Sequence, residues 1–170
     1  MKRHRSLHSL SRDHHQALVQ ARHLRLAAEA NDPDNLAQAA ARFAGYWEDE
    51  LQDHFLREEL ILLPLLAKHA SPENDELRET LRQHAEITRL VAELNGQLAR
   101  RTEIESHLLD SLGEALRLHI RFEENALFPK LEATVPEEEL ERMGEQLETE
   151  QSRTGQGGCA LSPKRQATEE

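Results

Sequence analysis

Apolar residues recur along the chain at the three- to four-residue spacing of a single helix face, and no stretch alternates over the length of a strand. This pattern predicts an all-α protein. We expect a first helix from Ser6 or Ser9 to about Ala30. Asp32 followed by Pro33 supplies an N-cap and a proline at the first helical position, which together predict the start of a second helix.

Similar start signals recur further along the chain. Ser71 followed by Pro72 repeats the cap-and-proline pattern, and Thr102 with Glu105 forms a capping box. Pro64 is expected to kink or end the second helix, with any continuation stopping near His69. After the first helix, the sequence therefore predicts helices at residues 33–64, 72–98 and 102–129. A second possible capping box, from Thr134 to Glu137, precedes a short fifth helix that ends at about Gln151.

Long helices joined by short connections favour antiparallel neighbours. We therefore predict an up-down-up-down antiparallel four-helix bundle followed by the short C-terminal fifth helix. The last residues contain GQGG and SPKRQATEE and carry no apolar period, so a disordered tail is expected there. This division gives one bundle domain at residues 1–151 and a tail at 152–170.

Composition narrows the possible partners. The 170 residues include 21 Lys and Arg against 32 Asp and Glu, a net charge of −11, which argues against nucleic acid or an anionic membrane surface as a partner. No apolar run is long enough to span a membrane, and the basic N-terminus lacks the apolar core of a signal peptide. Cys159 is the single cysteine, so no disulfide framework is possible within the chain. We expect a soluble, cytoplasmic protein.

The apolar faces of the second and fourth helices are interrupted by polar pairs. His54 and Glu58 lie one helical turn apart, as do His119 and Glu123. Each pair opens the motif H-x3-E-E-x2-L-[LF]-P, and the two copies are 65 residues apart. A buried carboxylate without compensation is costly, and a metal ion would supply the missing positive charge. The ten histidines of this Gly-poor chain also favour helices that hold a metal.

The first and third helices each contribute one further inward histidine. His14 shares a face with Leu10 and Ala17, and His84 shares a face with the apolar stripe of the third helix. His15 is the alternative to His14, but the apolar stripe favours His14. Each half of the chain therefore supplies one inward histidine and one His/Glu pair. The third-helix stripe is expected to contain Leu77, Leu81, Ile87, Val91, Leu94 and Leu98.

This constellation resembles the hemerythrin-like, or HHE cation-binding, family over about residues 7–131. The resemblance implies a four-helix bundle with a non-haem di-iron site, two oxo- or hydroxo-bridged iron ions whose carboxylate ligands bridge the metals. Glu59 and Glu124, each next to a proposed ligand, are alternative members of the shell, and zinc or manganese are possible substitutes for iron. The metal ligands that the resemblance implies are His14, His54, Glu58, His84, His119 and Glu123.

One position departs from the oxygen carriers of the family, which place a second histidine one turn after the equivalent of His84. Here that position is Thr88. Four histidines, two bridging glutamates and a bridging oxygen fill ten of the twelve positions of two octahedral irons. We therefore expect a nearly symmetric site with one open position on each iron.

The ligand set is also similar to that of di-iron proteins that repair iron–sulfur clusters, although their cysteine-bearing N-terminal segment has no counterpart here. The favoured function is binding of, or response to, oxygen, peroxide or nitric oxide, as a sensor, iron store or iron donor. One alternative is a di-iron peroxidase or oxidase. Another is a metal-stabilised module that meets a protein partner. A core in which these side chains only hydrogen-bond one another is the alternative without metal.

Overall fold

The computed structural model describes residues 3–71 and 74–157, and every regular element in this part of the chain is a helix. The all-α prediction is confirmed. A short 3-10 turn, η1 (Arg5–Leu7), leads into α1 (His8–Ala30). α1 ends at Asn31, whose N–H makes the last helical bond, to the carbonyl of Ala27, and whose left-handed backbone (φ 49°) turns the chain out of the helix.

The second helical stretch is continuous from Pro33 to His69 but changes its winding twice. It consists of α2 (Pro33–Tyr46), the π-helical turn η2 (Trp47–Leu51), α3 (Gln52–Arg57), the π-helical turn η3 (Glu58–Leu62) and α4 (Leu63–His69). Its start agrees with the prediction, because the Asp32 carboxylate accepts the N–H of Asn35 at 2.9 Å. Pro64 does not end it. The helix continues to His69, the residue near which any continuation beyond the proline was expected to stop.

The π turn explains how the helix passes this proline. A proline has no N–H, and its ring collides with the carbonyl four residues earlier in a regular α-helix. In η3 the N–H of Leu63 bonds instead to the carbonyl of Glu58, five residues back. The added residue in this turn loosens the winding just before Pro64.

The second copy of the motif repeats this solution. α6 (Ser106–Phe122) passes through the π-helical turn η4 (Glu123–Leu127) into α7 (Phe128–Thr134), and the N–H of Phe128 bonds to the carbonyl of Glu123. The helix therefore extends beyond Pro129, where the prediction had ended it. In both copies the π turn begins at the glutamate of the His/Glu pair.

Two predicted helix starts were wrong. α5 (Asp75–Arg100) is capped by Asn74, whose side chain accepts the N–H of Leu77 at 3.0 Å, and Pro72 of the predicted signal lies outside the described residues. α6 starts after Glu105 without a side-chain cap. Thr102 instead donates its hydroxyl to the carbonyl of Gln97 at 3.3 Å, so it closes the end of α5 rather than capping α6.

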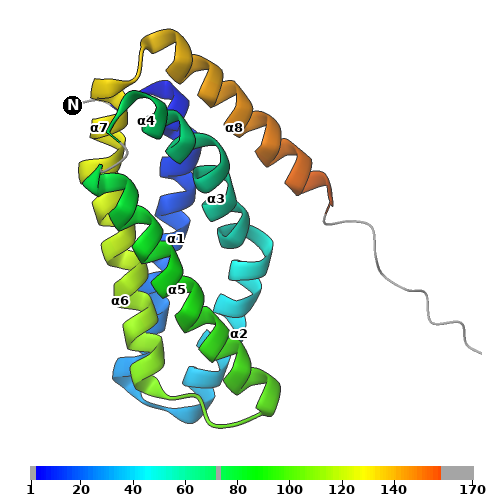
Figure 1. Cartoon of the computed structure of the whole chain (residues 1–170). Coiled ribbons are helices and arrows are strands. Elements are labelled where there is room, and N and C mark those ends of the chain that lie inside the picture. The colour runs from blue at the N-terminus through cyan, green and yellow to red at the C-terminus, as the bar shows by residue number, and fades with distance from the viewer. Residues whose placement is uncertain (1–2, 72–73, 158–170) are drawn as a thin grey trace, which may run out of the picture.

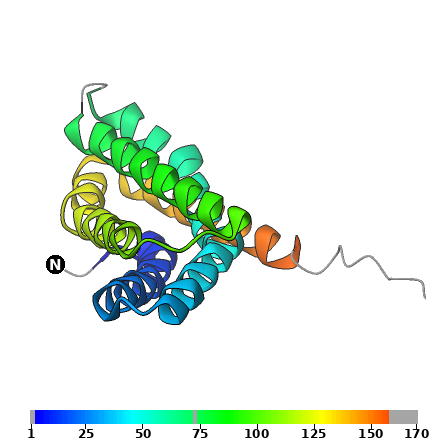
Figure 2. The same cartoon turned by 90° about the horizontal axis from the view of Figure 1, so that it is seen from below.

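The long helices lie side by side around a common centre. α1 packs against α2 and α6, and α5 packs against α6 and α2 (Figures 1 and 2). The last helix, α8 (Glu137–Gly157), contacts η1, η3 and α3 and crosses the outside of one end of this group (Figure 1). It continues past Gln151, where the fifth helix was predicted to end, and the part of the predicted tail from residue 158 onward lies outside the described residues.

The apolar core forms two clusters. One is centred on Phe43, Leu94 and Leu112, and the other, at the α8 end, includes Leu66, Phe128 and other buried residues. His14 falls between Leu10 and Ala17, which belong to different clusters, and His84, Glu58 and Glu123 fall between residues of different clusters in the same way. The polar centre is therefore enclosed on two sides by apolar side chains. No described helix is long and apolar enough to cross a membrane.

Candidate metal centre

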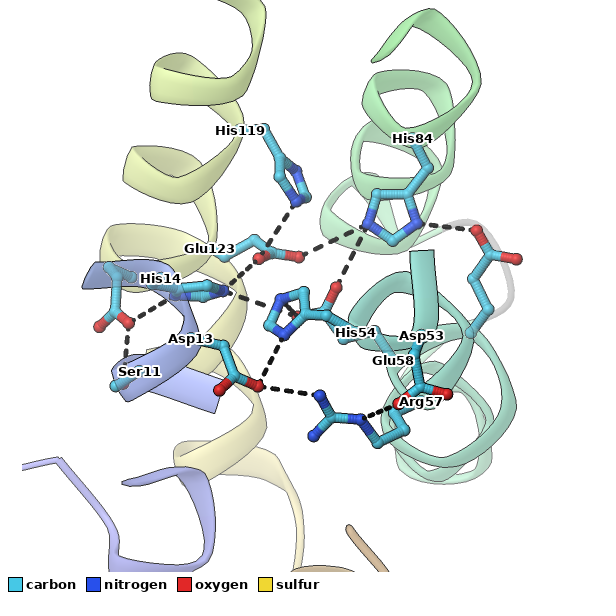
Figure 3. Close-up of polar contacts among 12 residues, drawn as sticks. Ser11, Asp13, His14, Asp53, His54, Arg57, Glu58, His84, His119 and Glu123 are labelled. Carbon is cyan, nitrogen blue, oxygen red and sulfur yellow. Dashed lines mark hydrogen bonds and ion pairs between the residues drawn. The ribbon is translucent and has the colours of Figure 1, made fainter. Parts of the chain in front are cut away.

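The six predicted ligands converge on one point in the interior of the molecule (Figure 3). Each is at most 3% exposed, and the two carboxylates are fully buried. α1, α3, α5 and α6 each supply one histidine. The glutamates are the first residues of the π turns η3 and η4. The inward residues are His14, His54, Glu58, His84, His119 and Glu123.

These side chains form two groups that share both glutamates. We call His14 and His54 the first half-site, and His84 and His119 the second half-site. Within each group of two histidines and two glutamates, the potential ligand atoms lie within 4.8 Å of one another. The Glu58 carboxylate faces both half-sites, with Oε1 3.2 Å from Nε2 of His54 and Oε2 3.3 Å from Nε2 of His84.

Glu123 is placed in a corresponding way. Its Oε2 lies 3.0 Å from Nε2 of His14 and 3.4 Å from Nε2 of His119. Its Oε1 is 4.0 Å from Nε2 of His84. Each carboxylate therefore lies between the two half-sites, as the sequence analysis expected of bridging residues.

The inward atoms have no hydrogen-bond partner among the described residues. This holds for Nε2 of His14, His84 and His119 and for all four carboxylate oxygens of Glu58 and Glu123. Leaving buried polar atoms unsatisfied costs about 1–3 kcal/mol each, and more when they are charged. A metal cation binds imidazole nitrogens and carboxylate oxygens together, so it would satisfy all of these atoms at once. The residues present thus fit a metal site.

The outer nitrogens of the histidines, in contrast, are all hydrogen-bonded. Glu124 Oε1 lies 2.8 Å from Nδ1 of His14, and Glu59 Oε1 lies 2.8 Å from Nδ1 of His84. An oxygen that can only accept places the proton on Nδ1 and leaves the lone pair of Nε2 facing the centre. Glu59 and Glu124, considered above as alternative ligands, lie on the outer side of the histidines in this structure.

The remaining two histidines bond to residues that the sequence analysis missed. Nδ1 of His54 lies 3.3 Å from Oδ2 of Asp13, and Nδ1 of His119 lies 3.2 Å from Oε1 of Gln83. A signal was available, because Asp13 and Gln83 each directly precede an inward histidine. Asp13 is in turn held by Arg57, whose Nη2 donates to it at 2.9 Å (Figure 3).

Without metal, the histidines and glutamates redistribute protons. Burial and the charge of Glu58 raise the pKa of Glu123 to about 7. Burial lowers the pKa of His54, but the Glu58 charge and the bond to Asp13 outweigh it and raise that pKa to about 8. His119 differs, since burial and the neighbouring His84 hold its pKa well below the ordinary value. In the metal-free centre, protons on some of the histidines thus supply part of the missing positive charge.

Phenylalanine rings fix two of the histidines in orientation. Phe55 stacks on His84 with ring centroids 3.9 Å apart and planes within 6°, and Phe128 stacks on His14 at 5.3 Å and 12°. Trp47 contacts Phe55 edge-on at 5.5 Å, one layer further from the centre. These rings exclude water from the histidine faces and leave rotation of the imidazoles little room.

Two neighbouring positions face away from the centre. His15 is exposed, whereas His14 is buried. Thr88 is also exposed, so the expectation that it stands in the place of a ligand was wrong. The inward positions of α5 alternate in steps of three and four, so the inner residue that follows His84 is Ile87, which is fully buried. The same register explains why Leu81, predicted for the core, is 49% exposed.

A comparison with known families decides the assignment. The family model described as the hemerythrin HHE cation binding domain matches residues 5–131, most of the chain and all six inward residues. The chain belongs to the hemerythrin HHE family. Neither the curated proteins nor the solved structures gave a significant match. Family membership and the two His/Glu groups together make it a metal-binding hemerythrin-like protein, and α8 is an addition beyond the matched residues.

Proposed function

We propose that this hemerythrin-like protein holds two iron ions in an up-down-up-down four-helix bundle and binds or responds to oxygen, peroxide or nitric oxide. His14 and His54 would hold one ion and His84 and His119 the other, with Glu58 and Glu123 shared. The observation that carries the proposal is the set of buried, unpartnered atoms in two groups with common carboxylates.

The residues around the centre have definite tasks in this proposal. Glu59, Glu124, Asp13 and Gln83 keep a proton on each outer nitrogen, so that the inner nitrogens are free to bind metal. Phe55 and Phe128 exclude water. Bound iron would supply the redox chemistry and the coordination positions at which a diatomic ligand or peroxide binds.

We place α8 within the functional domain, in keeping with the predicted domain of residues 1–151. Leu140, Met143 and Leu147 of this helix are buried in the apolar cluster next to the centre. Burying three such side chains contributes several kcal/mol by the usual estimate of about 1.5–3 kcal/mol for each. The helix therefore supports the end of the bundle that carries η3 and η4.

Metal analysis joined to an optical spectrum tests the proposal. Protein purified from cells grown with iron is expected to contain two irons per chain and to show charge-transfer bands that change on addition of peroxide. Stoichiometric zinc with no spectral response would contradict the iron and oxygen part. Protein that binds no iron, zinc or manganese after removal and re-addition of metal would contradict the metal site as a whole.

A further inference from the structure

The two half-sites have the same inner donors but different outer neighbours. Asp13 and Gln83 occupy equivalent positions, each one residue before the inward histidine of its half. Each accepts from Nδ1 of the other histidine in its half-site, at 3.3 and 3.2 Å. The place and the hydrogen bond are thus the same, but one acceptor is a carboxylate and the other a neutral amide.

The residues next to these acceptors, on the side away from the centre, also differ in charge. In the first half, Arg57 donates to Asp13 at 2.9 Å and to Asp53 at 3.2 Å, so a chain of charged groups runs outward from His54. The motif repeat places Phe122 and Leu118 at the positions equivalent to Arg57 and Asp53. The second half has no counterpart of this charged chain in the motif.

The amide of Gln83 can only act as an acceptor toward His119. Its NH2 group donates to Oε1 of Glu79 at 2.6 Å, which leaves its oxygen for Nδ1 of His119. The negative charge of Glu79 is therefore one hydrogen bond further from the histidine than the charge of Asp13 is from His54. A bond to a charged acceptor is roughly twice as strong as one to a neutral acceptor.

A carboxylate on Nδ1–H pushes electron density toward Nε2 and makes the imidazole a better metal ligand. The outer bonds of His14 and His84 do not make the first half-site the stronger one. Both are 2.8 Å bonds to glutamates. Ser11 and Arg3 also donate to Glu124 and draw charge away from His14, just as Arg57 draws some charge from Asp13, so these donations weaken rather than strengthen the first half-site. A stronger first half-site must therefore come from Asp13.

Arg57 keeps Asp13 in its place. A cavity of about 170 Å³ lies beside the outer side of His54 and is lined by Asp13, Tyr46, Arg57 and Gln151 among others. Water that entered this cavity would compete for the same hydrogen bonds. Arg57 is buried, and Gln151 of α8 adds a bond to Oδ1 of Asp13 at 3.4 Å, so both residues hold the carboxylate toward His54.

From this asymmetry we propose that Asp13, as a positioning residue, makes the first half-site the tighter of the two metal positions, so that the protein fills it first. This inference rests on the proposed two-metal function. Partners of this kind typically change metal affinity about 10- to 100-fold, so a separation of that size is expected between the two binding steps.

Zinc binding to the full-length, metal-free protein tests the proposal without any need for activity. Competition with a chromophoric chelator gives the two affinities. Nitrogen-15 NMR of the imidazoles shows which histidines bind first. In the unmodified protein, one equivalent of Zn²⁺ should shift Nε2 of His14 and His54, and a second equivalent those of His84 and His119.

Two variants separate the role of Asp13 from a general structural role. Asp13→Asn should weaken the tighter step about 10- to 100-fold and make the two pairs of histidines shift together. Gln83→Glu combined with Glu79→Gln, in which the amide at position 79 becomes the donor between the two side chains, should strengthen the weaker step and also bring the two affinities together. Asp110→Asn, which alters an exposed carboxylate bonded to Arg25, is the control and should leave both steps unchanged.

The outcomes are distinguishable. Equal affinities in the unmodified protein, prior filling of His84 and His119, or unchanged steps in the folded variants would overturn the inference while two bound zinc ions still supported the metal centre. Failure to bind zinc at all would count against the proposed function instead. If Asp13→Asn does not fold by circular dichroism, the Glu79→Gln/Gln83→Glu variant alone decides, since it moves a charge to the partly buried position 83 and removes no contact of the first half.

Discussion

The two halves of this molecule carry the same ligands to the centre but surround them differently. His54 and His119 open copies of one motif, and each is followed by a π turn that begins at a glutamate. Outside the centre the copies diverge, with Asp13 and Arg57 on one side and Gln83 and Phe122 on the other. The repeat therefore holds at the shared centre, at the outer glutamates Glu59 and Glu124 and at the two prolines, and it fails at the residues that contact His54 and His119 from outside.

This difference shows which positions the chemistry constrains. An inward residue must offer a nitrogen or oxygen that can bind a metal, because it is buried among other such atoms that have no hydrogen-bond partner. An outer residue need only accept a hydrogen bond from Nδ1, which a carboxylate or an amide oxygen can do. The outer positions can therefore tune each half-site separately without loss of the donor set.

The largest effect is expected where the halves meet. Glu58→Ala removes a carboxylate that faces both half-sites, so we expect loss of nearly all metal from both. His54→Ala and His119→Ala each remove a donor from one half-site and should lower metal content less. Metal analysis of the folded variants checks this order. His107→Ala, at an exposed residue, should retain the full content, and full metal content in the Glu58→Ala variant would remove that residue from the centre.

Removal of metal should lower the melting temperature. The unpartnered carboxylates are costly without a cation, and binding at about 100 times the dissociation constant adds roughly 2.7 kcal/mol to the free energy of unfolding. For a chain of this size that corresponds to a shift of about 5–10 °C. Calorimetry with and without chelator measures it. Coincident transitions would favour the alternative in which the histidines and carboxylates only bond one another.

The metal-free protein should become less stable as the pH rises from about 6.5 to 8.5. The pKa of His54 is raised to about 8, so its protonation stabilises the fold fully below its ordinary value of 6.5, and this contribution is lost as pH rises through 8. The raised pKa of Glu123, about 7, acts in the same direction. The expected change is on the order of 2 kcal/mol.

This pH dependence also distinguishes the halves. The pKa of His119 is lowered, so the folded chain holds this residue neutral in this range, whereas the unfolded chain still binds part of a proton there near the ordinary value of 6.5. His119 therefore adds a small rise in stability with pH, which opposes the fall caused by His54. His54→Ala should therefore flatten the dependence, and His119→Ala should largely retain it. Denaturant titrations of chelator-treated protein at three pH values measure both. Equal slopes in the two variants would contradict the assigned asymmetry.

The smallest effect is expected at Thr88. Its side chain is exposed, so Thr88→His should leave metal content, the spectrum and chelator-driven metal loss unchanged. Ile87→His, by contrast, places an imidazole on the inner face next to His84, where the original residue is fully buried. Chelator competition measures the rate of metal loss in the two variants. A slower loss of metal in the Thr88→His variant would restore the original expectation for that position.

The sequence by itself determined the helical fold class and the residues that meet at the centre. Periodicity places a residue on a face, and a His/Glu pair on an apolar face is conspicuous because burial makes such residues costly. The repeated motif added a second, independent copy of the same signal. These inferences need only the geometry of a single helix, which is why His54, Glu58, His119 and Glu123 were found together.

The tertiary structure alone decided what depends on the rotation and contacts of neighbouring helices. Thr88 and Ile87 flank the direction of His84 on α5, and only packing against the other helices shows that Ile87 is the inner one. The π turns η3 and η4 arise because the helix passes Pro64 and Pro129 while it remains packed against the other helices. The outer bonds of Asp13, Gln83, Glu59 and Glu124 join residues on different helices, and helix periodicity does not specify which side chains meet across a bundle.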